Sequence, residues 1–202
     1  MNRLAIVILL LSLLISVFYI QKRDEVSLYV KTLKYESIYK KTKEEVDLIN
    51  LVYVLQYTND NNKKIYYSKE LIDKVTYEGI QNSLYCDNYN ESFSEESPRD
   101  VFALLYMVNL LDAGEYDLFS QEFSLYYLEI ERPSRIDVIA IEKYGETNNV
   151  KIVDALVAGY QKIINDTDDD LLKQTCKVRI ELIKTVVEEK TEKTGDGSSV
   201  FK

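Results

Sequence analysis

Apolar residues at the start of the chain form an uninterrupted run that no later segment matches. The run extends from Leu4 to Ile20, and its seventeen residues include no charge and only two serines, Ser12 and Ser16. A helix rises about 1.5 Å per residue, so a run of this length spans roughly 26 Å, which suffices for a thin bilayer. The pattern therefore predicts that residues 4–20 enter or cross a membrane as a helix.

We interpret residues 1–23 as a signal-anchor or a signal peptide. Cleavage of a signal peptide requires small residues at two spaced positions, and the end of this run offers a poor site. No cysteine precedes Cys86, which excludes a lipid-modified bacterial signal. We therefore favour an uncleaved anchor.

The orientation of this anchor has two interpretations. Lys22 and Arg23 follow the run directly, and basic flanks mark the cytoplasmic side, which favours an inner-membrane protein with a cytoplasmic domain. The position of the run at the N-terminus is instead typical of an export signal. We favour the second interpretation, in which the domain is extracytoplasmic, either periplasmic or on the cell surface.

After residue 23, apolar residues recur three and four positions apart in segments that are bounded by residues typical of helix ends. Ser97 and Pro98 favour the start of a helix, and Gly114 favours its end. Residues 58–62 are predicted to form a loop, and Ser68 is predicted to cap a helix through about Tyr85.

The first and last of these helices each have a predicted apolar face. The face that follows the anchor comprises Val26, Tyr29, Val30, Leu33 and Ile38. The final helix runs to about Lys190, and its face comprises Leu171, Leu172, Val178, Leu182, Ile183 and Val186.

The sequence therefore predicts an all-α fold. We expect an irregular multi-helix bundle of about eight helices over residues 24–190, preceded by one N-terminal membrane helix and followed by a disordered tail at residues 191–202. Only two prolines and six glycines occur, which disfavours a sheet with many turns. No internal repeat period is evident.

Negative charge is concentrated in the middle of the chain. Residues 75–131 contain twelve acidic residues and one basic residue, Arg99, which gives this segment a net charge of −11, whereas the whole chain has −9. This imbalance disfavours nucleic-acid binding, because phosphates would be repelled, and favours a basic protein partner. The candidate partner-binding residues are acids and aromatic residues of this segment: Asp87, Tyr89, Glu91, Phe93, Glu95, Glu96, Asp100, Asp112, Glu115 and Asp117.

The chain has two cysteines, Cys86 and Cys176, and we consider both a disulfide and two separate thiols. An even number of cysteines in an exported chain favours pairing, and the loop of about ninety residues would stabilise the fold by about 4–5 kcal/mol. Buried unpaired thiols are also common.

Residue types that carry much of enzyme chemistry are missing. The chain has no histidine, which excludes histidine-based triads and metal sites, and it has no glycine-rich phosphate loop. The segment that begins at Asp166 resembles a calcium loop, but Leu171 and Lys177 stand where such a loop requires glycine and an acid. We therefore predict no catalysis, no cofactor, no metal and no small-molecule substrate.

These observations favour a non-catalytic, membrane-tethered protein-binding domain. Its most concrete form is an immunity-type inhibitor whose acids and tyrosines occupy the cleft of a basic toxin. The first alternative is a structural adaptor subunit of a membrane or secretion complex. The second is an envelope hydrolase that uses two carboxylates.

Overall fold

The computed structural model describes residues 3–85, 97–127 and 134–194, and it describes side chains only between residues 23 and 189. Within these ranges every regular element is a helix, which confirms the all-α prediction. The helices are α1 (Arg3–Thr42), α2 (Glu45–Leu55), α3 (Asn61–Ile72), α4 (Tyr77–Gln81), α6 (Pro98–Ala113), α7 (Tyr116–Tyr126), α8 (Ser134–Thr147), α9 (Val150–Asp166) and α10 (Asp170–Thr194).

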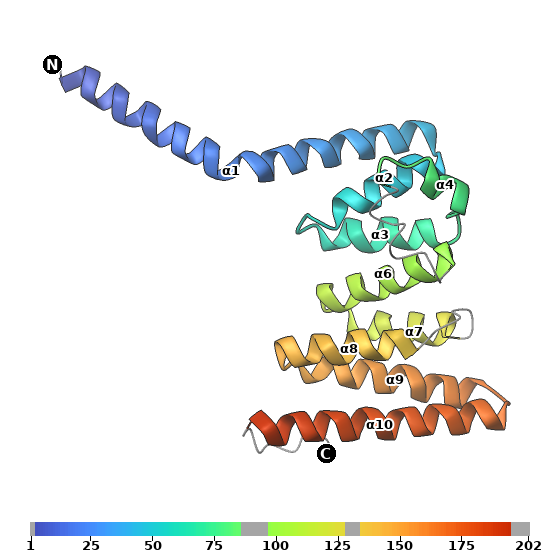
Figure 1. Cartoon of the computed structure of the whole chain (residues 1–202). Coiled ribbons are helices and arrows are strands. Elements are labelled where there is room, and N and C mark those ends of the chain that lie inside the picture. The colour runs from blue at the N-terminus through green and yellow to red at the C-terminus, as the bar shows by residue number, and fades with distance from the viewer. Residues whose placement is uncertain (1–2, 86–96, 128–133, 195–202) are drawn as a thin grey trace.

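The helices stack in chain order into a layered array, with α1 at one end and α10 at the other (Figure 1). Helix α2 packs against α1 and α3, α3 packs against α6, α7 packs against α9, and α9 packs against α10. Helix α8 lies against α9 and also contacts α6 and α10. Packing between neighbours along the chain is typical of helical solenoids, so the predicted bundle takes the form of an elongated stack.

The predicted boundaries of α6 are confirmed by its hydrogen bonds. The hydroxyl of Ser97 accepts from the backbone N–H of Asp100 at 3.1 Å, and Pro98 begins the helix. Gly114 ends it with a left-handed φ of 76°, and the N–H of Glu115 donates to the carbonyl of Leu110 at 3.0 Å. Glycine adopts this conformation without the steric cost that a Cβ atom brings.

The predicted boundaries of α3 were wrong. Asp60 caps this helix, because its carboxylate accepts from the backbone N–H of Lys63, so the helix begins inside the segment that was predicted as a loop. Ser68 lies within α3 and donates to the carbonyl of Lys64 at 2.6 Å. The helix ends at Ile72, and Thr76 caps the separate short helix α4.

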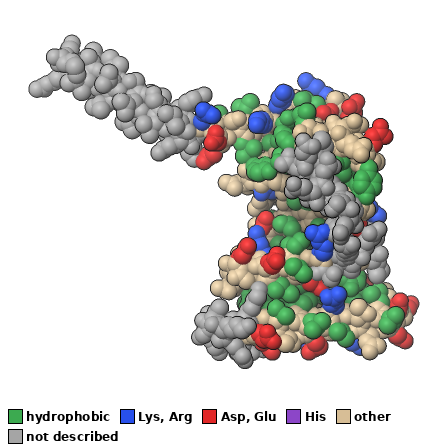
Figure 2. Space-filling model, in the orientation of Figure 1, with side chains coloured by type: hydrophobic (Ala, Val, Ile, Leu, Met, Phe, Trp, Pro, Cys, Tyr) green, Lys and Arg blue, Asp and Glu red, His purple; other side chains and the backbone are tan. Residues whose placement is uncertain are grey.

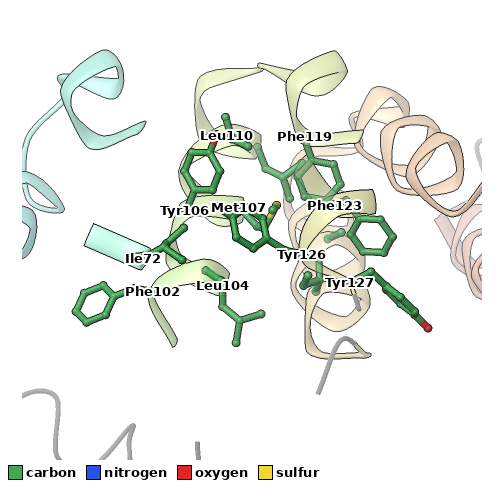
Figure 3. Close-up of a cluster of buried hydrophobic side chains, with 14 of the residues drawn as sticks. Ile72, Phe102, Leu104, Tyr106, Met107, Leu110, Phe119, Phe123, Tyr126 and Tyr127 are labelled. Atoms are coloured by element: carbon green, nitrogen blue, oxygen red, sulfur yellow. The ribbon is translucent and has the colours of Figure 1, made fainter. Parts of the chain in front are cut away.

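Aromatic side chains fill the middle of the array (Figure 3). Phe119 and Phe123 of α7 stack with ring centroids 6.0 Å apart, and Phe123 meets Tyr160 of α9 edge to face at 4.8 Å. Gly159 allows this close packing, because a Cβ atom there would lie 2.6 Å from Cδ1 of Phe123. The contact between α7 and α9 therefore depends on one residue without a side chain.

The predicted apolar face of α10 was wrong in part. The side chains that pack against the array are Cys176, Ile180, Ile183 and Val187. Four residues of the predicted face are exposed instead: Leu171, Val178, Leu182 and Val186. The helix has apolar residues on two sides, and α9 covers only one of them.

The same correction applies to the described part of α1. Its buried side comprises Thr32, Glu36 and Tyr39, whereas the predicted apolar face is mostly exposed. The exposed members are Val26, Tyr29, Val30 and Leu33, and Ile38 is half-buried.

Residues 4–20 form the N-terminal half of α1, but their side chains lie outside the described part of the chain, so the predicted membrane helix stays a prediction. No helix built from the residues described with side chains combines the length and the apolar character needed to cross a bilayer.

Cys176 is a buried free thiol. Cys86 lies outside the described residues. Its neighbour Tyr85 stacks on Tyr53 of α2, near the end of the array opposite to α10 (Figure 1). A disulfide requires two cysteines whose Cα atoms lie within about 7 Å of each other, and no disulfide is present among the described residues.

Candidate functional site

A surface hollow lies where the start of α7 meets α9. Its volume is about 440 Å³, and its lining comprises Gly114, Glu115, Tyr116, Asp117, Ser120, Lys151, Asp154, Ala155 and Ala158. Gly114 and the turn that it makes possible place Glu115 and Asp117 at one wall. Helix α9 supplies the other wall, because its packing against α7 brings residues 151–158 alongside.

Hydrogen bonds between the two walls fix the shape of the hollow. The hydroxyl of Ser120 on α7 lies 2.9 Å from the carbonyl of Ala155 on α9, to which it donates. The side-chain amide of Asn149, which caps α9, donates to the hydroxyl of Tyr116. These two hydrogen bonds therefore fix the positions of the two walls relative to each other.

The charge of the hollow is negative. Three carboxylates, those of Glu115, Asp117 and Asp154, line it together with one ammonium group, that of Lys151, which leaves two negative charges in excess. Its remaining surface comes from Tyr116 and the small residues Ala155 and Ala158. Lysine and arginine combine an apolar stem with a charged tip, so this lining suits the side chain of a basic residue.

The structure separates the predicted partner-binding residues into three groups. Asp87, Tyr89, Glu91, Phe93, Glu95 and Glu96 lie outside the described residues. Asp100 is buried, and Asp112 forms an ion pair with Lys143 of α8. Glu115 and Asp117 are exposed and line the hollow.

Sequence reasoning missed Asp154 and Lys151 at this site. They lie more than thirty residues after Asp117 and are neighbours only because α9 packs on α7. Both are polar residues on the outer face of a strongly amphipathic helix, which also describes many solvated residues, so the sequence alone offers no signal that would select them.

A second polar cluster lies inside the array. The hydroxyl of Tyr160 donates to both carboxylate oxygens of Asp137 on α8, at 2.6 and 2.8 Å. Arg179 of α10 approaches the same carboxylate at 3.7 Å. Burial raises the pKa of Asp137, and the hydrogen bond from Tyr160 and the charge of Arg179 oppose this rise. The cluster joins α8, α9 and α10 and is closed to ligands, since Asp137 and Tyr160 are buried.

A third cluster joins α1 to α3. Lys40 and Lys63 each approach the carboxylate of Glu36 at 2.7 Å, and Tyr67 donates to it at 3.1 Å. Burial acts to raise the pKa of Glu36, but these hydrogen bonds outweigh it and lower the pKa to about 2. The carboxylate is therefore ionised at all physiological pH values and serves to fix α1 against the array.

Among the residues that the structure describes, no group of three or more acids and cysteines is placed to hold a metal ion. The hollow between α7 and α9 is thus the candidate that combines exposure, shape and charge, and its lining is suited to binding. The chain matches no protein-family model, and neither the curated proteins nor the solved structures include one that is similar to it.

Proposed function

We propose that this protein is a membrane-tethered, non-catalytic binding protein that receives a basic segment of a partner protein. The observation that carries the proposal is the hollow between α7 and α9, which is lined by Glu115, Asp117 and Asp154 together with Tyr116 and two alanines. An inhibitor of a basic toxin is one concrete form of this function. Residues 4–20 provide the tether, and the domain lies on the extracytoplasmic side.

The physical argument concerns size and charge together. A hollow of about 440 Å³ accommodates a long side chain, and its excess of two negative charges attracts a cation before contact is made. The stem of a lysine or arginine would pack on Tyr116 and Ala158, while its charged tip would meet the carboxylates. Exposed ion pairs contribute modestly, so several basic residues of one partner would act together.

The test uses the full chain in a mild detergent and a short lysine- and arginine-rich peptide as the probe. Affinity measured by calorimetry should fall as salt rises, because exposed charges are screened. Changing Asp117 and Asp154 together to asparagine should weaken binding about tenfold, which corresponds to about 1.4 kcal/mol. The matched control is Asp24→Asn together with Asp170→Asn, the same two changes at carboxylates that are 98% and 99% exposed and lie outside the hollow.

If the control weakens peptide binding as much as the double variant does, the peptide responds to net charge alone, and the hollow is not its binding site. Binding that is unchanged by the double variant would have the same consequence.

A second candidate function, an adaptor subunit, is favoured by α10. This last helix exposes Leu171, Val178 and Leu182, and the end of a helical array normally has a polar outer face. An adaptor should co-purify with other membrane proteins after detergent extraction. Val178→Asp should abolish that association, and the double variant in the hollow should leave it intact.

A further inference from the structure

The described part of α1 has an exposed apolar stripe. It comprises Val26, Tyr29, Val30 and Leu33, whose side chains are between 44% and 64% exposed. At about 100° per residue these four side chains fall within an arc of about 100° on the helix surface. The buried side of α1 packs on α2 and α3, and the stripe lies beside this buried side, about 100° around the helix.

Basic residues border one edge of this stripe. Arg23, Lys34 and Lys41 are exposed and lie together beside Val30, whereas the opposite edge, beside Tyr29, has the acids Glu25 and Glu36. Figure 2 shows hydrophobic and basic side chains side by side along the described part of α1, with acidic side chains where that part begins. An apolar stripe with a basic border is typical of helices that lie in the interface of a membrane containing anionic lipids.

A groove adjoins the stripe and extends its apolar surface. Leu28, Tyr29 and Leu33 of α1 form one wall, and Tyr57, which follows α2, forms part of the other. The polar part of the lining includes the carboxylates of Glu25 and Asp60 and the ammonium group of Lys63. The groove has a volume of about 400 Å³, and the ring of Tyr57 is 62% exposed. Tyrosine favours the headgroup region, where its ring is buried and its hydroxyl stays hydrated.

We propose that the stripe and the groove rest on the surface of a lipid bilayer, with the apolar side chains among the headgroups and upper acyl chains. This inference rests on the membrane tether proposed above. Helix α1 continues from residues 4–20 without interruption, which places Val26 to Leu33 about 9 to 20 Å along the chain from the apolar run. Figure 1 shows that α1 bends between its two halves, so the second half can lie along a surface that the first half enters.

The chain contains no tryptophan, so one introduced tryptophan reports on its own surroundings. Tyr29→Trp places this probe in the stripe, and Leu125→Trp places it at a position on α7 with nearly equal exposure, 61% against 64%. Each full-length variant is reconstituted into vesicles of phosphatidylcholine and phosphatidylglycerol. A parallel set contains brominated acyl chains, which quench tryptophan on contact.

We expect the emission of the tryptophan at position 29 to shift to shorter wavelength and to be quenched by brominated lipid, while the probe at position 125 shows neither effect. Replacing phosphatidylglycerol by phosphatidylcholine should reduce the quenching at position 29. If the protein floats with the vesicles but the tryptophan at position 29 emits as it would in water, the inference about the stripe is wrong, and the proposed tether is unaffected. A blue shift without quenching would also overturn it and would indicate a protein on the stripe. Protein that fails to float with vesicles would remove the tether itself.

Discussion

The close contact between α7 and α9 predicts that Gly159→Ala destabilises the protein. In most helices this change is favourable by about 1 kcal/mol, because alanine has the higher helix propensity. Here the new Cβ would lie 2.6 Å from Cδ1, 3.1 Å from Cγ and 3.2 Å from Cβ of Phe123. Carbon atoms pack best at about 3.5–4.0 Å, so the ring or the helix would have to move by about 1 Å.

The ring of Phe123 has little room for such a movement. It is fully buried and is surrounded by three other rings, those of Phe119, Tyr127 and Tyr160. Inserting a methyl group into a packed core costs about 1–3 kcal/mol, and we expect the upper part of this range. After the gain in helix propensity is subtracted, Gly159→Ala should lower the free energy of unfolding by about 2 kcal/mol.

Urea unfolding of the full chain in a mild detergent, followed by circular dichroism, measures this change. With a slope of about 2 kcal/mol per molar urea, the midpoint should fall by about 1 M. The matched control is Gly145→Ala, the same change at an exposed position of α8, which should raise stability by up to about 1 kcal/mol. If both variants are stabilised equally, α7 and α9 do not meet as the structure has them.

The remaining predictions concern three polar contacts. Hydrogen bonds lower the pKa of Glu36 from 4.5 to about 2, so the stability that this carboxylate gives the fold is complete above pH 4.5 and is lost as the pH falls through about 2. Glu36→Gln should therefore lower the free energy of unfolding by about 1–2 kcal/mol at neutral pH, and the free energy of unfolding of this variant should depend less on pH between 4.5 and 2. Tyr160→Phe removes the donor to Asp137 and should cost about 2 kcal/mol at pH 7, and unfolding curves at lower pH should show a smaller loss as the carboxyl takes up a proton. Asp60→Ala removes the cap of α3 and should lower the unfolding free energy by about 1 kcal/mol, with fewer protected amides in its first turn by hydrogen exchange.

Local sequence signals predicted α6 well because the residues that begin and end it act within one turn. Ser97 reaches a backbone N–H three residues later, and Gly114 adopts a conformation that few other residues tolerate. The same logic failed at α3, where two residues compete as caps. Asp60 and Ser68 are both good capping residues, and the helix begins at the earlier one, which adds Tyr67 and Ser68 to its buried face.

The buried face of α10 could not be predicted from its own residues. Its apolar side chains form two stripes, and period and composition do not decide which of them packs. Long-range packing decides, because α10 packs against α9 and buries Cys176 and Ile183 on the side that it turns to the array. A helix at the end of an array has one neighbouring layer, so one of its apolar stripes stays exposed.

The acidic middle segment shows why charge along the sequence overstates charge on the surface. Glu122 is buried and pairs with Lys69 of α3 at 2.5 Å, and Asp112 pairs with Lys143 of α8. Both lysines lie outside residues 75–131 in the sequence. The stacking of the helices therefore places positive charges next to acids of this segment. At the hollow, by contrast, the carboxylates of Glu115, Asp117 and Asp154 outnumber the one ammonium group, that of Lys151. Recognition on the scale of one or a few basic side chains therefore fits the described surface better than a broad acidic face.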